Sequence, residues 1–173
     1  LIRHDIPKHV EPIRPKKKNA LKPASMGTGF EHAKGAAIVG MLNAWIGPEK
    51  FRDGLREFLS KREYSTATTQ DLVTALNGNK ERSVGPVLYP FLERSGYPLL
   101  QFKIECSQDK ASTVHIEQVK TNGEGSNEAS AWTVPVCFRY GTGEDSAQQC
   151  FLMDKRKVTR SLSSTDCPDW LHG

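Results

Sequence analysis

The chain has 173 residues, of which 37% are hydrophobic and 25% charged, and its formal net charge at pH 7 is +4. This length allows one sizeable hydrophobic core or two small ones, and the composition excludes an intrinsically disordered chain. The basic runs at residues 16–18 and 155–157 contain no interleaved aromatic residues, so we expect solvated faces and no nucleic-acid partner. No apolar run approaches the roughly 18 residues that a membrane-spanning helix needs, so no membrane span is expected.

The amino-terminal segment predicts an extended arm over residues 1–29. Four prolines exclude a long helix there: Pro7, Pro12, Pro15 and Pro23. The segment has no hydrophobic block of the signal-peptide kind, and the chain begins without Met. We therefore expect a piece of a longer protein, whose location stays open between the cytoplasm and an exported or periplasmic compartment.

A helix is predicted next, beginning in the stretch FEHAKGAAIVGML at residues 30–42. Its large apolar residues recur with helical spacing, at i, i+4, i+7 and i+8: Ile38, Leu42, Trp45 and Ile46. Small and apolar residues fill the other faces, a pattern that indicates a helix enclosed by other elements. His32 and Lys34 place polar chemistry at the start of this apolar helix.

Three shorter helices are expected after it. Gly47-Pro48 precedes the second helix, because proline is favoured at the first helical position, and this helix has a narrower apolar stripe: Phe51, Leu55, Phe58 and Leu59. The third helix begins at Thr68-x-x-Asp71, which resembles a capping box. The fourth covers residues 87–92 and ends at Ser95-Gly96, after which Pro98 enforces an extended chain.

From Leu99 on, the hydrophobic period falls to two, which predicts antiparallel strands. Four runs alternate in this way: LLQFKIEC, STVHIEQV, WTVPVCFRY and QQCFLMD. In the third run, one face carries the large apolar residues Trp132, Val134, Val136 and Phe138. The sequence therefore predicts an α+β fold, with a helical part at residues 1–97 and an antiparallel β part at residues 98–173.

The four cysteines all lie in the predicted β part: Cys106, Cys137, Cys150 and Cys167. They allow three complete pairings, which would suit an exported protein. Buried reduced thiols are an equally good interpretation, since free cysteine behaves as a small hydrophobic residue. A zinc knot is not expected, because no two cysteines form a C-x-x-C pair.

No familiar catalytic motif is complete in the chain. It has neither an H-E-x-x-H zinc helix nor a G-x-S-x-G nucleophile elbow. Two histidines belong to the arm, one to a strand surface and one to the chain end: His4, His9, His115 and His172. His32 remains as the candidate functional residue, no metal ligand is expected in this chain, and Lys34 is expected to reach past the apolar face to water.

The order of these signals resembles the aminopeptidase-N-type (gluzincin) zinc metallopeptidase family. The segments FEHAKGAAIVGMLNAWIGPEKFRDGLREFLSKREYSTATTQDLVTAL and FLERSGYPLLQFKI are similar to the end of the catalytic domain in that family. The similarity is strong over residues 11–105 and looser in the stretches WTVPVCFRY and CPDWLHG. It implies that residues 1–97 are the last helices of a thermolysin-like peptidase domain and that residues 98–173 form a β-sandwich.

The resemblance also implies a function for the parent protein, which would remove amino-terminal residues from peptides. It implies that zinc is held by helices encoded before Leu1. This chain is then expected to lack the metal, to be inactive alone, and to need the missing N-terminal catalytic domain as its partner.

His32 departs from the family pattern, because HAKGA stands where Tyr-x-Lys-Gly-Ala is expected. The family tyrosine donates a hydrogen bond to the oxyanion of the tetrahedral intermediate. Imidazole could replace it, or the parent could be a weakened or inactive relative, and both interpretations stay open. Phe91 similarly stands where the family usually has tryptophan.

A function from another class is a non-catalytic module that binds proteins. The helix over residues 38–46 distinguishes the two: a piece of a catalytic domain should leave it partly uncovered, whereas a self-standing module should cover it.

Overall fold

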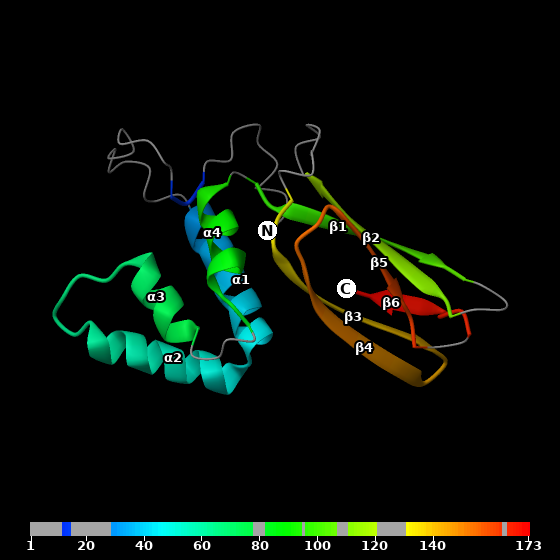
Figure 1. Cartoon of the computed structure of the whole chain (residues 1–173), viewed down its shortest axis with the longest axis horizontal. Helices are drawn as coiled ribbons and strands as arrows, with labels where there is room; N and C mark the ends of the chain where they lie inside the picture. The colour runs from blue at the N-terminus through cyan, green and yellow to red at the C-terminus, as the bar shows by residue number, and fades with distance from the viewer. Residues whose placement is uncertain are drawn as a thin grey trace. The chain divides into compact units, whose positions relative to one another are not determined.

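The computed structural model describes residues 12–14, 29–77, 82–94, 96–106, 111–120, 131–163 and 166–173. The chain divides into two compact units, residues 1–95 and 96–173 (Figure 1). The predicted arm lies outside the described residues except at 12–14 and at Gly29, where the first helix begins.

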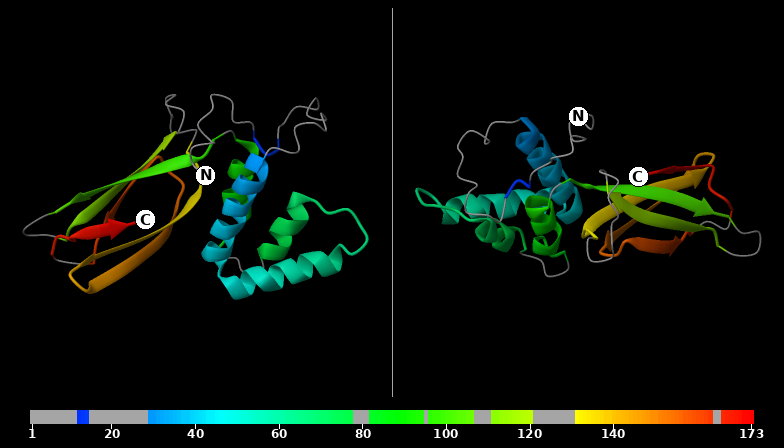
Figure 2. Two further views of the ribbon diagram at one scale, coloured as in Figure 1. Left: turned by 180° about the vertical axis from the view of Figure 1, so that it is seen from behind. Right: turned by 90° about the horizontal axis from the view of Figure 1, so that it is seen from above.

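The described part of the first unit is helical, with α1 (Gly29–Ile46), α2 (Pro48–Lys61), α3 (Thr69–Leu76) and α4 (Gly85–Glu93). Gly47, with φ of 92°, separates α1 from α2, and Pro48 opens α2 as predicted. Helix α1 packs against α2 and α4, and α2 packs against α3 (Figure 2). The core of this unit consists of Ile38, Leu42, Ile46, Val73, Ala75, Leu76, Val84, Val87, Leu88 and Phe91.

The expectation that α1 is enclosed on all sides is wrong. One side carries the buried residues Ile38, Leu42 and Ile46, but Val39 is 50% exposed, and small residues around it are exposed as well: Ala36, Ala37, Gly40 and Ala44. Within the described residues, α2 and α4 cover only the opposite side. Apolar composition predicted burial, but burial also requires a neighbouring element on each face.

Helix α2 differs from its prediction at one position. Phe51, Leu55 and Phe58 are partly buried, whereas Leu59 is 64% exposed. Gly54 is buried instead, because a Cβ there would lie 2.9 Å from Leu76 Cδ2. Because α3 approaches α2 closely at this glycine, the side of α2 that carries Gly54 is buried.

The capping box at the start of α3 is confirmed. The backbone N–H of Asp71 donates to Thr68 Oγ1 at 3.2 Å, and the backbone N–H of Thr68 donates to Asp71 Oδ2 at 2.9 Å. Arg62 also donates to this carboxylate. The Thr68 hydroxyl above all, with the Thr68 backbone N–H and Arg62, lowers the pKa of Asp71 below its ordinary value of 3.8.

We expect this capping carboxylate to make the helical unit sensitive to acid. A lowered folded-state pKa contributes stability that is present above the unfolded value of 3.8 and is lost as the pH falls through the folded value. Asp71→Asn should therefore flatten the fall in denaturant midpoint between neutral and acidic pH, measured by circular dichroism. Asp53→Asn removes an exposed carboxylate of α2 that caps no helix, so it is the control and should change this acid dependence less than Asp71→Asn does.

The second unit consists of two antiparallel sheets of three strands. One has the order β1 (Pro98–Glu105), β2 (Thr113–Lys120) and β5 (Lys157–Ser161). The other has the order β4 (Asp145–Met153), β3 (Val134–Thr142) and β6 (Trp170–His172). The predicted α+β class is confirmed, and the four predicted strands match β1 to β4 apart from shifts at their ends.

The two sheets stack as a small sandwich (Figure 2). Phe102 of β1 and Phe138 of β3 meet across it, with ring centroids 5.9 Å apart. The predicted inward face of the third strand is confirmed, because its four residues are buried: Trp132, Val134, Val136 and Phe138. A buried side chain joins the layers as well, since Gln118 Nε2 of β2 donates to the Trp132 carbonyl at 2.9 Å.

Strands β5 and β6 were not predicted from the sequence. β5 begins in the basic run that was expected to be only a solvated face. Arg156 and Lys157 instead form ion pairs with Glu117 of β2, at 3.1 and 3.2 Å. Strand β5 pairs with β2, in which Glu117 is the register partner of Lys157, about forty residues later in the chain. No local sequence pattern indicates a pairing over this separation.

Of the two interpretations of the cysteines, disulfides and reduced thiols, the structure confirms the disulfides. Cys106 bonds to Cys167, and Cys137 bonds to Cys150, so no free cysteine remains. Cys137 and Cys150 are direct partners in the register of β3 and β4. The first disulfide joins residues 61 positions apart and connects the two sheets.

Candidate functional site

His32 lies in the first turns of α1, and its side chain is exposed. Residues at i+4, i+7 and i+8 from it are exposed as well, namely Ala36, Val39 and Gly40. Because residues at this spacing share one side of a helix, the imidazole lies at the amino-terminal end of the uncovered side of α1. The side chains of Phe30 and Glu31, beside it in sequence, are outside the described residues.

Lys34 does not reach water, contrary to the prediction. Its side chain is only 8% exposed, and Nζ donates to the backbone carbonyl of Arg94 at 3.3 Å. Arg94 is the residue that ends α4. Carbonyl groups at a helix end lack intrahelical donors and attract cations, so the end of α4 offers this ammonium group a partner inside the unit.

These contacts give the first turns of α1 two different sides. Lys34 ties one side to α4, sixty residues later in the chain, while His32 stays accessible on the other side. A hydrogen-bond donor on a helix that is fixed by packing can be held at a defined position relative to a bound molecule. The arrangement is therefore suited to presenting an imidazole N–H to a ligand.

The other described histidines lie in the β unit. His115 of β2 is a cross-strand surface residue, as predicted: Nε2 contacts Glu105 Oε2 of β1, and Nδ1 contacts Thr159 Oγ1 of β5, both at 2.9 Å. His115 and Thr159 line a groove of about 620 Å³ on this sheet. His172 is exposed on β6, and His4 and His9 lie outside the described residues.

Within the described ranges, no three histidine, cysteine, aspartate or glutamate side chains are grouped so as to hold a metal ion. The same part of the chain contains no helix with the length and apolarity to cross a membrane.

The chain is similar to known proteins in both sequence and structure. The sequence profile described as "Peptidase family M1 domain" matches residues 2–91. The chain belongs to peptidase family M1. The matched segment includes His32, the whole helix α1 and most of α4.

Two curated M1 relatives illustrate the similarity. The chain is 28% identical to "Aminopeptidase M1-B" of Oryza sativa subsp. japonica, over 72% of this chain and 13% of that protein. It is 40% identical to "Glutamyl aminopeptidase" of Sus scrofa, over 44% of this chain and 8% of that protein. The M1 chain therefore spans only a small fraction of the curated relatives that it matches.

A solved structure supports the fold. The crystal structure of Legionella pneumophila aminopeptidase A in complex with aspartic acid matches 83% of this M1 chain and 16% of that chain, with a TM-score of 0.69 and 18% identity. The matched share of this chain is longer than its first unit, residues 1–95, so the likeness extends into the β unit.

The family resemblance is confirmed by the match over residues 2–91, while the role of His32 stays a prediction. Two features of the M1 chain were not predicted. The contact between Lys34 and Arg94 was not predicted, because it joins residues from different helices. The Glu105–His115–Thr159 trio was also missed, although alternation in the two predicted strands could have placed Glu105 and His115 on the same face.

Proposed function

We propose that this chain is part of a zinc-dependent M1 aminopeptidase that removes amino-terminal residues from peptides. The observation that carries the proposal is the family match over residues 2–91. The curated relatives at 28% and 40% identity are named as aminopeptidases, which supports the same activity class. In this proposal, the zinc ion and its ligands belong to other parts of a longer protein, of which the curated relatives show that this chain would be a small fraction.

In this proposal, His32 donates a hydrogen bond to the oxygen of the scissile carbonyl as negative charge develops on it. Removing one such donor typically lowers the rate by about a hundred- to a thousandfold. Two features support the role. The imidazole is exposed at the start of α1, and the Lys34–Arg94 contact fixes the adjacent turn of the helix.

The uncovered side of α1 supports the proposal that a further part of the protein packs here. Val39, an apolar residue in the middle of α1, is 50% exposed. A self-standing protein-binding module would be expected to cover this helix, so the exposure favours a piece of a catalytic domain. The partner of this side is then the N-terminal part of the same catalytic domain, and peptides reach His32 only through that assembly.

The isolated chain is expected to be inactive, which tests the proposal directly. After purification with added zinc, elemental analysis should find less than stoichiometric metal, and aminoacyl reporter substrates should stay intact. The longer protein that contains this chain should hold zinc and cleave the same reporters. Activity of the isolated chain, or a longer protein without peptidase activity, would contradict the proposal.

A further inference from the structure

The carboxy-terminal segment, residues 166–173, contains the shortest strand of the structure. β6 has three residues and, among the described strands, pairs with β3 alone, through Arg139–His172, Tyr140–Leu171 and Gly141–Trp170. In the sheet order β4-β3-β6, it pairs with the Arg139–Gly141 part of the edge of β3 that faces away from β4. A strand with three register pairs contributes few hydrogen bonds, so it belongs to the part of a fold that opens most readily.

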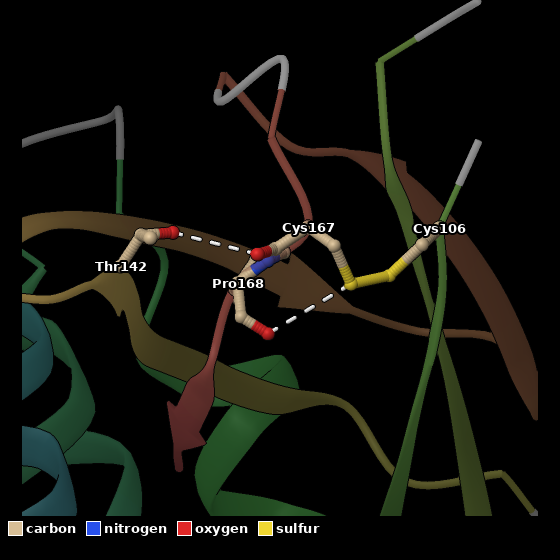
Figure 3. Close-up of a disulfide and its surroundings, with 4 residues drawn as sticks. All are labelled: Cys106, Thr142, Cys167 and Pro168. Atoms are coloured by element: carbon tan, nitrogen blue, oxygen red, sulfur yellow. Dashed lines mark hydrogen bonds between the residues drawn. A yellow bond between two sulfur atoms is a disulfide. The ribbon is translucent and has the colours of Figure 1, made fainter. Parts of the chain in front are cut away.

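Surface hydrogen bonds also hold this segment, in which Pro168 is buried. The Asp169 backbone N–H donates to the Gly141 carbonyl at 2.9 Å, and the Asp169 carboxylate accepts from the Gly143 N–H at 3.2 Å. The Thr142 hydroxyl donates to the Cys167 carbonyl at 3.4 Å (Figure 3). Trp170 remains 36% exposed. These contacts are on the surface, where water competes with each hydrogen bond.

The Cys106–Cys167 disulfide supplies a covalent connection at the start of this segment. Cys106 follows β1 in one sheet, and Cys167 precedes β6 in the other, with their Cα atoms 5.3 Å apart (Figure 3). Both cysteines are exposed, so a dissolved thiol can reach the bond. No strand pairing joins β1 to β6, and the disulfide is therefore the covalent link that keeps β6 near the opposite sheet.

The second disulfide has a different position. Cys137 and Cys150 face each other inside the β3–β4 hairpin, which has nine register pairs. The hairpin is aligned on both sides of the bond, from Val134–Met153 to Thr142–Asp145. Cleaving this disulfide should leave the hairpin paired, so it provides a matched control in the same unit.

We propose that the Cys106–Cys167 disulfide is a redox-operated latch, which holds β6 on β3 when oxidised and releases residues 166–173 when reduced. A dithiol reductant attacks one sulfur as a thiolate and forms a mixed disulfide. Its second thiolate then displaces the remaining protein thiol. The reductant becomes a disulfide, and both cysteines become thiols after gaining two electrons and two protons.

Release of β6 uncovers the backbone donors and acceptors of Arg139–Gly141 on β3. An unpaired strand edge of this kind can pair with another strand. The latch is closed in an oxidising compartment and open where glutathione or thioredoxin keeps thiols reduced. The β unit would thus present different surfaces in the two environments.

Hydrogen exchange of the full chain, followed by mass spectrometry, tests the latch. In oxidised protein, residues 166–173 should be protected; after addition of dithiothreitol, they should exchange at least about tenfold faster. Residues 113–119 of β2 should keep their protection in both states. Joint loss of protection in both segments would mean cooperative unfolding and would overturn the latch.

Two double variants assign the effect to one bond. Cys106→Ala with Cys167→Ala should exchange rapidly at residues 166–173 without reductant, and dithiothreitol should change nothing further there. Cys137→Ala with Cys150→Ala should behave like the oxidised wild type until reductant is added. A protected segment in the first variant, or an open one in the second, would contradict the proposal. If the first variant does not fold, reduction of the folded second variant decides, because that protein contains only the latch.

Discussion

His32→Ala, introduced into the longer aminopeptidase that we propose, is expected to lower kcat by about a hundred- to a thousandfold. The imidazole N–H would stabilise the oxyanion only after the carbonyl oxygen becomes charged, so KM should change much less than kcat. Steady-state kinetics with an aminoacyl reporter measure both constants. A variant with unchanged kcat would remove His32 from the reaction.

His32→Tyr distinguishes a working donor from a weakened enzyme. Tyrosine is the residue that the family resemblance implies at this position, and its hydroxyl also donates one hydrogen bond. If His32 is a working donor, His32→Tyr should retain a kcat close to that of the wild type. A large gain in kcat would instead mean that imidazole is a poor donor. His115→Gln, which removes a histidine of the β unit, is the control and should leave kcat unchanged.

Gly141→Ala is expected to destabilise the β unit by about 3 kcal/mol, the upper end of typical overpacking costs. A Cβ at Gly141 would lie 2.1 Å from the Asp145 carbonyl oxygen and 2.7 Å from the Trp170 ring. The oxygen belongs to the backbone of the neighbouring strand, so β3 and β4 would have to separate locally. Urea unfolding, monitored by tryptophan fluorescence, measures the loss.

Gly143→Ala is the control for the same hairpin. Gly143 has φ of 57°, and a Cβ there would meet nothing within 4 Å. Its cost is limited to the left-handed backbone conformation, about 1–2 kcal/mol for a residue with a side chain. If Gly141→Ala is no more destabilising than Gly143→Ala, the contact with Asp145 and Trp170 does not limit this position.

Local patterns accounted for the elements that depend on residues close in sequence. Thr68 and Asp71 are three residues apart, and the cap that they form needs no other part of the chain. Alternation from Trp132 to Phe138 likewise identified the buried face of β3, because successive side chains of a strand point to opposite sides. Gly47-Pro48 marked the end of α1 for the same reason, since the signal is in the backbone preferences of two residues.

The predictions that were wrong or incomplete concern side chains whose partners lie far away in the sequence, or helix faces that no neighbouring element covers. Val39 was expected to be buried because its helix is apolar, yet burial depends on what covers each face. Lys34 was expected in water because the carbonyl of Arg94 could not be placed beside it from sequence. Four cysteines allowed three pairings, and only the positions of β1, β3, β4 and residue 167 select the pairs that form.

The α+β class, the order of most helices and strands and the M1 family could be predicted from the amino-acid sequence, which also supplied His32 as a candidate that stays a prediction. The fold class and the order of elements depend on short-range periodicity and turn residues, whereas the family was identified from the resemblance of motifs along the chain to a known family. The tertiary structure alone decided the buried position of Lys34, the uncovered side of α1, strands β5 and β6, and the two disulfides. Each of these requires residues far apart in sequence to meet, and their meeting is fixed by packing rather than by local conformational preference.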